Sequence, residues 1–303
     1  MESDKKQRAI PFHGLGDYSP FGGESGGAYV GKFQNSAKYM PNRMRLHRHH
    51  YFEIFWLNGN GAHVNDFEVY RISAPSLVFV TPGQVHRWLN GRRMYGDFVC
   101  FTQSFFDAGA PPPSPLLNYT FWYPHQTSPV LTVPPDATAD VAMIFDQMEK
   151  EFSDKSEGFE TALRALLEVL FIRAERLFKQ STASVKSDRD SALVRQFRLA
   201  LETHFSAIQS VTDYARLLKM SPDRLSKAVH ERIGQPASEM IRQRMLLEAK
   251  RLLAHTDMTV SEIAYALNFR DPSYFSRFFR RETDQAPGEF RESAAGKASP
   301  LSR

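Results

Sequence analysis

Short apolar runs separated by polar turns occupy much of the first half of the chain, which is typical of β-strands. Residues 47–57 predict one strand, in which a period of two puts five side chains on the same face: His47, His49, Tyr51, Glu53 and Phe55. From Tyr29 to about Val133, short runs rich in Phe, Val and Ile are separated by turn signals, such as Asn-Gly-Asn-Gly at residues 58–61 and Pro82-Gly83. Strands and turns at this spacing predict a sandwich or a small barrel. The preceding residues are rich in Gly, Ser and charge, and they predict an N-terminal arm.

A helical period replaces this alternation after a proline-rich stretch at residues 107–135. Residues 136–152 and 158–179 carry apolar side chains at i, i+3 and i+4, so we expect two helices packed on the barrel. A short polar stretch of small residues then predicts a linker. The result is an α+β chain with an arm at 1–28, a first domain at 29–180, a linker at 181–190, a second, all-helical domain at 191–292 and a disordered tail at 293–303.

One helical pattern occurs twice in the second domain, at an offset of about fifty positions. Each copy opens with a hydroxyl and a carboxylate three residues apart, which is the signature of a helix N-cap: Ser210 with Asp213, and Thr259 with Glu262. A second N-cap followed by proline begins another helix in each copy, at Ser221-Pro222 and Asp271-Pro272. The sequence therefore predicts two helix-turn-helix motifs, at about 210–232 and about 259–281, joined by one long helix at about 237–255.

The second helix of each motif has a polar face opposite its apolar stripe. Such side chains can donate hydrogen bonds to phosphates and base edges in the major groove. The connecting helix spans roughly 28 Å, and successive major-groove faces lie about 34 Å apart, so one chain can reach two grooves. A helical bundle with a solvated basic face is the alternative for one pair, but two copies in phase favour DNA recognition. The residues predicted to contact DNA are Asp223, Arg224, Ser226, Lys227, Arg270, Ser273, Tyr274, Ser276 and Arg277.

Residues 267–281 read LNFRDPSYFSRFFRR, and Ala286-Pro287 and Phe290-Arg291 follow them. With the long helix before it, this stretch closely resembles the signature of the AraC/XylS transcription regulators, over roughly residues 193–291. The resemblance implies a sequence-specific DNA-binding regulator, with activation the expected sign, that contacts RNA polymerase and forms a homodimer. The family generally has glycine at three turns or helix ends where this chain has Lys219, Asn268 and Asp284. Asn and Asp tolerate the left-handed conformation at such positions better than lysine does.

Charge and composition agree with this division. The chain carries 38 Lys and Arg against 34 Asp and Glu, and residues 191–303 hold 18 against 13, so the positive excess lies in the C-terminal part. The single cysteine, Cys100, excludes an intrachain disulfide framework and a cysteine zinc cluster. Neither a run of 18 apolar residues nor a signal-peptide pattern is present, so we expect a cytoplasmic protein without a membrane partner.

Histidines and a glutamate in the first domain form the sharpest chemical pattern there. His47 and His49, with Glu53 four residues later, and Pro82-Gly83 followed by His86, resemble the two cupin motifs. The resemblance implies a jelly-roll barrel. In metal-binding cupins the matching positions are the ligands, so His47, His49, Glu53 and His86 form a candidate metal site for a cupin enzyme or a metal sensor.

We favour a small-molecule cavity at this place, without a metal or another cofactor, because sensor domains of the AraC/XylS family keep such residues without using a metal. Aromatic rings would form its walls, and histidines with an arginine would supply donors. Residues 73–86 also resemble regulators of aromatic-acid catabolism, which implies an aromatic carboxylate as effector. We prefer a regulator to a cupin metalloenzyme, since an enzyme has no use for a repeated helix-turn-helix. The predicted effector-binding residues are His47, His49, Tyr51, Glu53, His86, Arg87 and Trp88.

Overall fold

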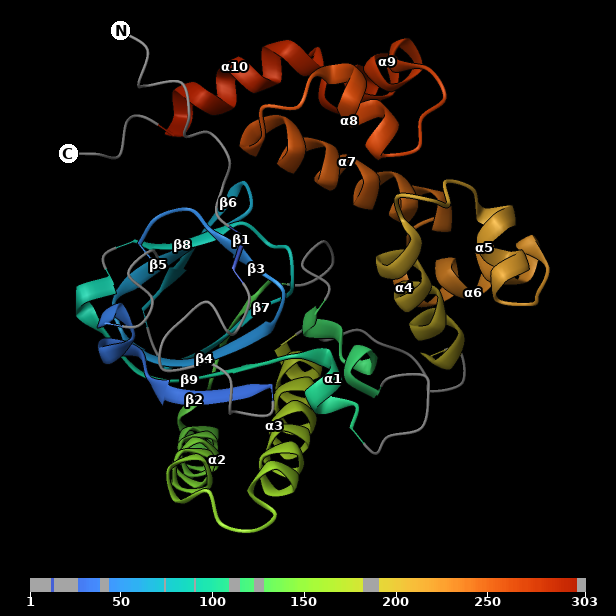
Figure 1. Cartoon of the computed structure of the whole chain (residues 1–303). Helices are drawn as coiled ribbons and strands as arrows, with labels where there is room; N and C mark the ends of the chain where they lie inside the picture. Colours follow the sequence, from blue (N-terminus) through green and yellow to red (C-terminus); the bar gives the residue numbers. More distant parts are fainter. Residues whose placement is uncertain are drawn as a thin grey trace, which may run out of the picture. The chain divides into compact units, whose positions relative to one another are not determined.

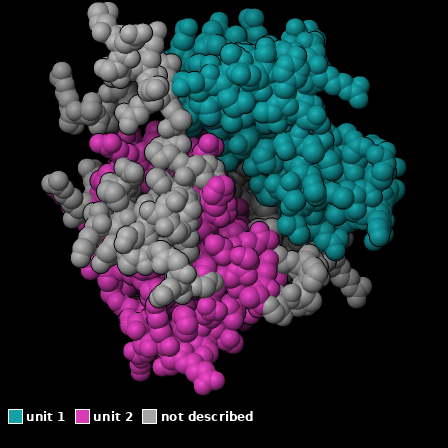
Figure 2. All heavy atoms as spheres, in the orientation of Figure 1, with its two compact units in different colours: residues 1–10, 186–303 teal, residues 11–185 magenta. Residues whose placement is uncertain are grey.

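The computed structural model forms two compact units, residues 11–185 and residues 186–303 with 1–10 (Figure 2). The linker predicted at 181–190 lies, apart from its first residue, outside the described residues, as do most of the predicted arm and the end of the predicted tail. Within the described ranges, no helix combines the length and the apolar character needed to cross a membrane. The structure describes residues 12–13, 27–38, 44–73, 75–89, 91–108, 115–122, 128–181 and 191–298.

The N-terminal unit (residues 11–185) contains two antiparallel sheets and a short parallel pair of strands (Figure 1). The larger sheet has the strand order β10-β7-β4-β9-β2, with strands at Val130–Thr132, Ser76–Val80, Phe52–Gly59, Met94–Phe101 and Ala28–Lys32. The smaller sheet has the order β6-β5-β8, with strands at Glu68–Ile72, Gly61–Asn65 and His86–Leu89. In the parallel pair, β1 (Phe12–His13) lies beside β3 (Arg48–His49). The β-rich first half is therefore as the sequence predicts.

The strand expected over residues 47–57 is broken in two. β3 ends at His49 and β4 begins at Phe52. β3 pairs with β1, whereas β4 pairs with β7 and β9, so the chain changes sheets at this point. Main-chain hydrogen bonds of 3.1 and 2.9 Å between His47 and His86 also connect the start of this segment to β8. The break places histidines and Glu53 close to both sheets.

β4 has two buried faces, which explains its apolar residues at consecutive positions. Phe52 belongs to a core that the sheet shares with α2 (Pro135–Asp154) and α3 (Phe159–Ser181). Phe55, on the opposite face, belongs to a core with Trp88 of the smaller sheet. Alternation along β4 therefore separates a face covered by helices from a face that looks toward the second sheet (Figure 1).

Short helices complete the N-terminal unit. Two of them, with β10, occupy the described part of the proline-rich stretch. Phe121 and Trp122 from this stretch close the helix-covered core, with ring centroids 4.2 Å from Phe79 and 4.9 Å from Phe52 respectively. The short helices are η2 (Phe33–Lys38), η3 (Gly91–Arg93), α1 (Gln103–Phe106), η4 (Pro115–Asn118) and η5 (Thr120–Trp122).

The described residues of the C-terminal unit form helices joined by short connections, without a strand among them. All four predicted N-caps are confirmed, because each side chain accepts a hydrogen bond from the first turn of its helix: Ser210, Ser221, Thr259 and Asp271. Thr259 and Glu262 form a complete capping box. The helices are α4 (Ser191–His204), α5 (Val211–Leu217), α6 (Pro222–Ile233), α7 (Ala237–His255), α8 (Val260–Ala266), α9 (Pro272–Thr283) and α10 (Pro287–Ala298).

The three positions that depart from the family's glycines all adopt the left-handed conformation. Lys219, Asn268 and Asp284 have φ angles of 55°, 60° and 59°. Asn268 and Asp284 are residue types that accept this conformation, whereas Lys219 lacks a short polar side chain to support it. The turn between α5 and α6 forms nonetheless, and Met220 N donates to Ala215 O at 2.9 Å.

The tail was expected to be disordered from residue 293, but α10 continues to Ala298. Two alanines at 294 and 295 favour helix in this segment. Arg291 also ties α10 to the end of α7, since its Nε donates to Leu253 O at 3.1 Å. Residues 293–298 are therefore helical, which corrects the predicted boundary of the tail.

Candidate functional site

The outer faces of α6 and α9 carry most of the side chains predicted to contact DNA. On α6, Arg224 and Lys227 are exposed, while Leu225 and Val229 are buried on the inner face. On α9, Tyr274 is 54% exposed. Because the apolar stripe of each helix is buried, its polar side chains point outward. The remaining predicted contacts are also exposed, except that Ser226 and Ser276 are half-buried: Asp223, Arg270, Ser273 and Arg277.

Arg277 and Ser276 differ in whether their polar groups already have a hydrogen-bond or ion-pair partner. The Arg277 guanidinium lies 5.9 Å from the Tyr274 ring centroid, and no carboxylate pairs with it among the residues that the structure describes. The Ser276 hydroxyl donates to Pro272 O at 2.9 Å within its own helix. Arg277 is thus available to a ligand, whereas a contact by Ser276 would have to share its hydroxyl.

Side-chain hydrogen bonds connect the first helix pair, α5 and α6, to the second pair, α8 and α9. Gln209 Nε2 donates to Leu267 O at 2.8 Å, and Asn268 Nδ2 donates to Ala207 O at 3.2 Å. Each bond joins the segment before α5 to the turn after α8. Arg244 of α7 adds an ion pair of 2.8 Å with Glu202 of α4. Sequence reasoning missed these contacts, because nothing in the spacing of the residues indicates that the segments meet.

A carboxylate in the first turn of α5 and another in that of α8 bond to the N-cap residues Ser210 and Thr259. The pKa of Asp213 is lowered because the Ser210 hydroxyl donates to it at 2.6 Å, as does Arg216 Nη1 at 2.6 Å. The pKa of Glu262 is lowered because the main-chain N–H of Thr259 donates to it at 2.6 Å, with help from the Thr259 hydroxyl. The helices that support α6 and α9 are therefore capped in the ionised state of these carboxylates.

In the N-terminal unit, His49, Glu53 and His86 form a buried cluster on the face of β4 that looks toward the smaller sheet. Nε2 of His49 lies 3.0 Å from Glu53 Oε2, and Nε2 of His86 lies 3.3 Å from the same oxygen. Cys100 Sγ donates to the other carboxylate oxygen at 3.4 Å. The donor atoms of these three residues all lie within 4.8 Å of one another, a spacing that can hold a metal ion.

Burial dominates the electrostatics of this cluster. It is the largest influence on Glu53 and acts to raise its pKa, but His49 and His86 together hold that pKa well below its usual range. Burial lowers the pKa of His49 against the opposing effect of Glu53, and it lowers that of His47 to about 3 with a further contribution from His86. Burial, followed by Glu53, raises the pKa of Cys100. Burial therefore favours the neutral forms of His47 and His49, and the histidines favour the ionised form of Glu53.

The other four predicted effector residues differ in where they lie relative to this cluster. Tyr51 stacks on His49, with ring centroids 4.0 Å apart. Trp88 is buried, 4.3 Å from the His63 ring. Arg87 lies between His86 and Trp88 on β8 and is half-buried, so the alternation of the strand places it on the opposite face, away from the cluster. His47, a predicted metal ligand, adjoins His86 at 4.2 Å between ring centroids but is not one of the three convergent groups.

Sequence reasoning missed His63 and Cys100. His63 is fully buried on β5, and no side chain or main-chain group of the described residues bonds either of its ring nitrogens. Cys100 is the cross-strand partner of Glu53 in the pairing of β4 with β9. The period of two in β5 could have placed His63 on the inner face, but only the strand register brings Cys100 to Glu53.

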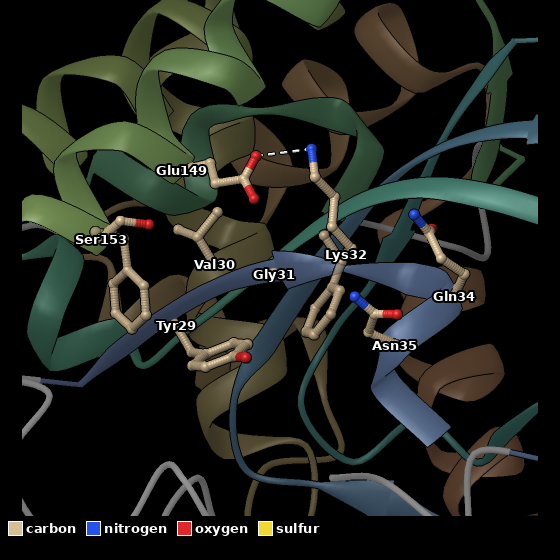
Figure 3. Close-up of a pocket in the computed structure, with 10 residues that line it drawn as sticks. Tyr29, Val30, Gly31, Lys32, Gln34, Asn35, Glu149 and Ser153 are labelled. Atoms are coloured by element: carbon tan, nitrogen blue, oxygen red, sulfur yellow. Dashed lines mark ion pairs between the residues drawn. The ribbon is translucent and has the colours of Figure 1, made fainter. Parts of the chain in front are cut away.

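An open pocket of about 700 Å³ lies at the edge of the larger sheet, between β2, η2 and α2 (Figure 3). Lys32 lines this pocket, and its ammonium group forms ion pairs with Asp97 at 2.6 Å and with Glu149 of α2 at 2.7 Å. Although burial is the largest influence and acts to lower it, the pKa of Lys32 is raised by these two carboxylates. None of the predicted effector residues lies here. The lining residues are Tyr29, Val30, Gly31, Lys32, Gln34, Asn35, Phe98, Glu149, Phe152 and Ser153.

Comparison with known proteins bears on both units. A family model described as "Helix-turn-helix domain" matches residues 214–293. The activator RhaS of Klebsiella pneumoniae is 27% identical over 264 residues, covering 81% of this chain and 87% of RhaS, and the RhaS of Salmonella arizonae is 26% identical over 255 residues. Among solved structures, ToxT of Vibrio cholerae is 15% identical with a TM-score of 0.38 and covers 80% of this chain and 89% of ToxT. The DNA-binding domain of AdpA, solved with a target DNA, is 25% identical with a TM-score of 0.32 and covers 38% of this chain and 99% of that domain.

The capped helices with outward polar faces and the matched domain define a helix-turn-helix DNA-binding regulator. The matched domain and the similarity to RhaS over most of the chain support an AraC/XylS family transcription regulator. Its relatives are transcription regulators and not enzymes, as the sequence led us to expect.

Proposed function

We propose that α6 and α9 are the recognition helices of two helix-turn-helix motifs that occupy consecutive major grooves of one operator. The observation that carries the proposal is the repeat itself: two proline-started, N-capped helices, each with one face buried and the other exposed. α7 has 19 residues and would space the motifs by roughly 28 Å. Arg224, Lys227 and Arg277 would supply charge for phosphates and donors for base edges.

Arg277→Ala tests the assignment on α9. Because Arg277 is exposed and no carboxylate pairs with it among the described residues, we expect the variant to fold normally and to bind its operator about 1 to 3 kcal/mol more weakly. Competition against unrelated DNA, measured by fluorescence anisotropy, reports specificity. Arg281→Ala is the matched control, since Arg281 lies on the same helix and already pairs with Glu282 at 2.8 Å. Unchanged selectivity in Arg277→Ala would remove Arg277 from base recognition.

We also propose that the protein activates transcription as a homodimer that contacts RNA polymerase. Activation is the role that the name of RhaS prints for that relative. Three exposed apolar side chains on α2 and α3 support a dimer contact there: Met143, Val169 and Ile172. Exposed apolar residues that gather on adjacent helices are typical of subunit interfaces.

For the N-terminal unit, we propose a cupin-like jelly-roll domain that binds a small-molecule effector in the pocket of Figure 3. The pocket volume suits a drug-sized ligand, and the rings of Tyr29, Phe98 and Phe152 offer apolar contact. The residues predicted from the sequence are packed against one another instead, as the 4.0 Å stacking of Tyr51 on His49 illustrates. The open pocket is therefore the better effector site.

An aromatic carboxylate would bind this pocket by exchanging partners on Lys32. Lys32 already holds two carboxylates, so the ligand takes the place of Glu149 while its ring stacks among the aromatic side chains. This exchange would release α2 from β2, because Glu149 is the residue of α2 that pairs with Lys32. Since α2 also contributes to the proposed dimer contact, effector binding would change the dimer by shifting its population between two arrangements.

Thermal unfolding with a panel of aromatic acids, neutral aromatics and sugars tests this site. A ligand that binds the folded state raises the unfolding midpoint in a saturable way. We expect Ser153→Phe, which fills the pocket from α2, to weaken binding of that ligand at least about tenfold. Lys150→Phe is the control, because Lys150 is exposed on the same helix and does not line the pocket. Equal binding by both variants would place the effector elsewhere.

A further inference from the structure

We propose that Gln209 and Asn268 fix the spacing between the two recognition helices, so that the protein selects operators with one particular number of base pairs between the two grooves. This role rests on the proposed docking of α6 and α9 in consecutive major grooves, and it adds a determinant of specificity outside both helices. Gln209 and Asn268 are positioning residues, because each acts through a hydrogen bond to the other motif and not through contact with DNA.

Two hydrogen bonds connect the motifs at one place and in opposite directions. Gln209, just before α5, donates from Nε2 to Leu267 O at 2.8 Å. Asn268, just after α8, donates from Nδ2 to Ala207 O at 3.2 Å. Leu267 is the C-cap of α8, where the last carbonyl groups of a helix lack a partner within it, so Gln209 satisfies a group that the helix leaves open. Residues 207–209 and 267–268 thus form a clasp between the two motifs.

The helix-turn-helix motif itself does not require this clasp, because the other copy lacks both donors. Aligned at their N-caps, the copies have Met258 in the position of Gln209 and Lys219 in the position of Asn268. Methionine has no N–H to donate. Lys219 has the same left-handed backbone as Asn268, with a φ of 55° against 60°, so the turn forms without an amide side chain there. The clasp therefore serves the connection between the motifs and not the folding of either one.

Each side of the clasp is attached firmly to its own motif. Phe269, the residue after Asn268, is buried, and its ring centroid lies 5.2 Å from that of Phe275 and 5.3 Å from that of Phe278, both on α9. On the other side, Gln209 is followed directly by the N-cap residue of α5. A displacement of α9 relative to the first motif is therefore transmitted to the clasp through buried aromatic contacts.

The clasp resists the displacement that a changed operator spacing demands. One base pair added between the two grooves moves the second groove by about 3.4 Å along the DNA and turns it by about 35°. If α9 follows that groove, both hydrogen bonds break, since such a bond is lost beyond about 3.6 Å. The apolar core that both motifs share with α7 is less selective, because apolar contact is non-directional. The two amides thereby make the spacing of the grooves a condition for tight binding.

Binding of the full-length protein to two DNA duplexes tests the proposal. The first duplex is selected from a pool of random sequence by the unsubstituted protein and trimmed to the site of one chain, and the second contains one additional base pair between its two grooves. The spacing penalty is the ratio of the two dissociation constants, and we expect at least about tenfold for the unsubstituted protein. Gln209→Met combined with Asn268→Gly should lower this penalty about tenfold, the effect of two ordinary hydrogen bonds, and change affinity for the selected duplex less than about threefold.

The substitutions are chosen to remove the donors and keep the fold. Methionine is about as long as Gln209 without its amide, and glycine accepts the left-handed backbone of Asn268. Asn268→Asp is a second variant at the same position, since aspartate tolerates this backbone but its carboxylate cannot donate, and it should match Asn268→Gly. Lys219→Gly is the matched control for turn flexibility and should leave the spacing penalty unchanged, because Lys219 has the same backbone conformation in the other copy. Hydrogen exchange in α5 and α9 reports folding.

The outcomes separate this role from the docking on which it rests. A spacing penalty of the double variant within about twofold of that of the unsubstituted protein would overturn the role of the clasp and leave two-groove docking intact. Equal losses of affinity for both duplexes would also overturn it, because they would make Gln209 or Asn268 a DNA contact. If the unsubstituted protein bound both duplexes equally well, or hydroxyl-radical footprinting showed a single protected groove, two-groove docking would fail and the role of the clasp with it.

Discussion

Phe275→Ala is expected to lower the free energy of unfolding of the C-terminal unit by about 3 to 5 kcal/mol and to abolish operator binding. Phe275 is fully buried on α9, and its ring centroid lies 5.2 Å from that of Phe269 and 6.1 Å from that of Phe279. Truncation leaves a cavity beneath the proposed recognition helix, which then loses the packing that fixes its exposed face. A loss of this size is a large part of the stability of a small domain.

Hydrogen exchange read by mass spectrometry on α9, together with operator titration, measures both effects in the full-length chain. Tyr274→Ala is the matched control, because Tyr274 is the adjacent residue and is exposed. It should leave exchange in α9 unchanged and weaken only DNA binding. Tryptophan fluorescence should not respond in either variant, since all three tryptophans lie in the N-terminal unit. If Phe275→Ala kept the exchange rates of the unsubstituted protein, the aromatic core would not be what holds α9.

The C-terminal unit could be predicted from the sequence because its signals are local. Each N-cap residue predicts a helix that begins directly after it, and all four cap their helices as expected: Ser210, Ser221, Thr259 and Asp271. The contacts between the helix pairs were not predictable in this way. Gln209 reaches the main chain at Leu267, and no local pattern marks a hydrogen bond between side chain and main chain so far apart in the sequence.

In the N-terminal unit, the periodicity of the sequence predicted the strands and the faces of their side chains, but not which strands pair with each other. The period of two over residues 47–57 correctly placed Glu53 and Phe55 on the same face of β4, but it did not indicate the break between β3 and β4. The neighbours of Glu53 depend on register, which brings Cys100 from β9 and His86 from β8 to the same carboxylate. Arg87 was predicted to supply a donor to the effector, but the alternation of β8 turns it to the face opposite His86.

The pocket of Figure 3 escaped prediction for a related reason. Lys32 is a charged residue in an otherwise apolar strand, and that is the signal that could have drawn attention to it. Its partners come from β9 and α2, so the sequence alone does not indicate that Asp97 and Glu149 share one lysine. The chemistry of this site is assembled by tertiary packing between a sheet edge and a helix that follows much later in the chain.

Gly96→Ala is expected to destabilise the N-terminal unit by about 3 kcal/mol or more while leaving α6 and α9 folded. Gly96 lies on β9 opposite Leu57 of β4 and has a φ of 142°. A Cβ added there would lie 2.0 Å from the main-chain oxygen of Trp56, so the two central strands of the larger sheet would have to separate. Because β4 also carries Glu53, the separation would disturb the histidine cluster as well.

Gly158→Ala separates the two causes of this loss, which are the steric clash of the added Cβ and the backbone cost of a positive φ. Gly158 also has a positive φ, 82°, but an added Cβ would meet nothing within 4 Å. It should therefore show only the backbone cost of about 1 to 2 kcal/mol. Denaturation followed by tryptophan fluorescence compares the two variants in the same unit. A similar loss in both would mean that β4 and β9 can move apart easily at this point. A much larger loss in Gly96→Ala, with hydrogen exchange in α9 unchanged, would show that the close approach of these strands stabilises the N-terminal unit independently of the C-terminal unit.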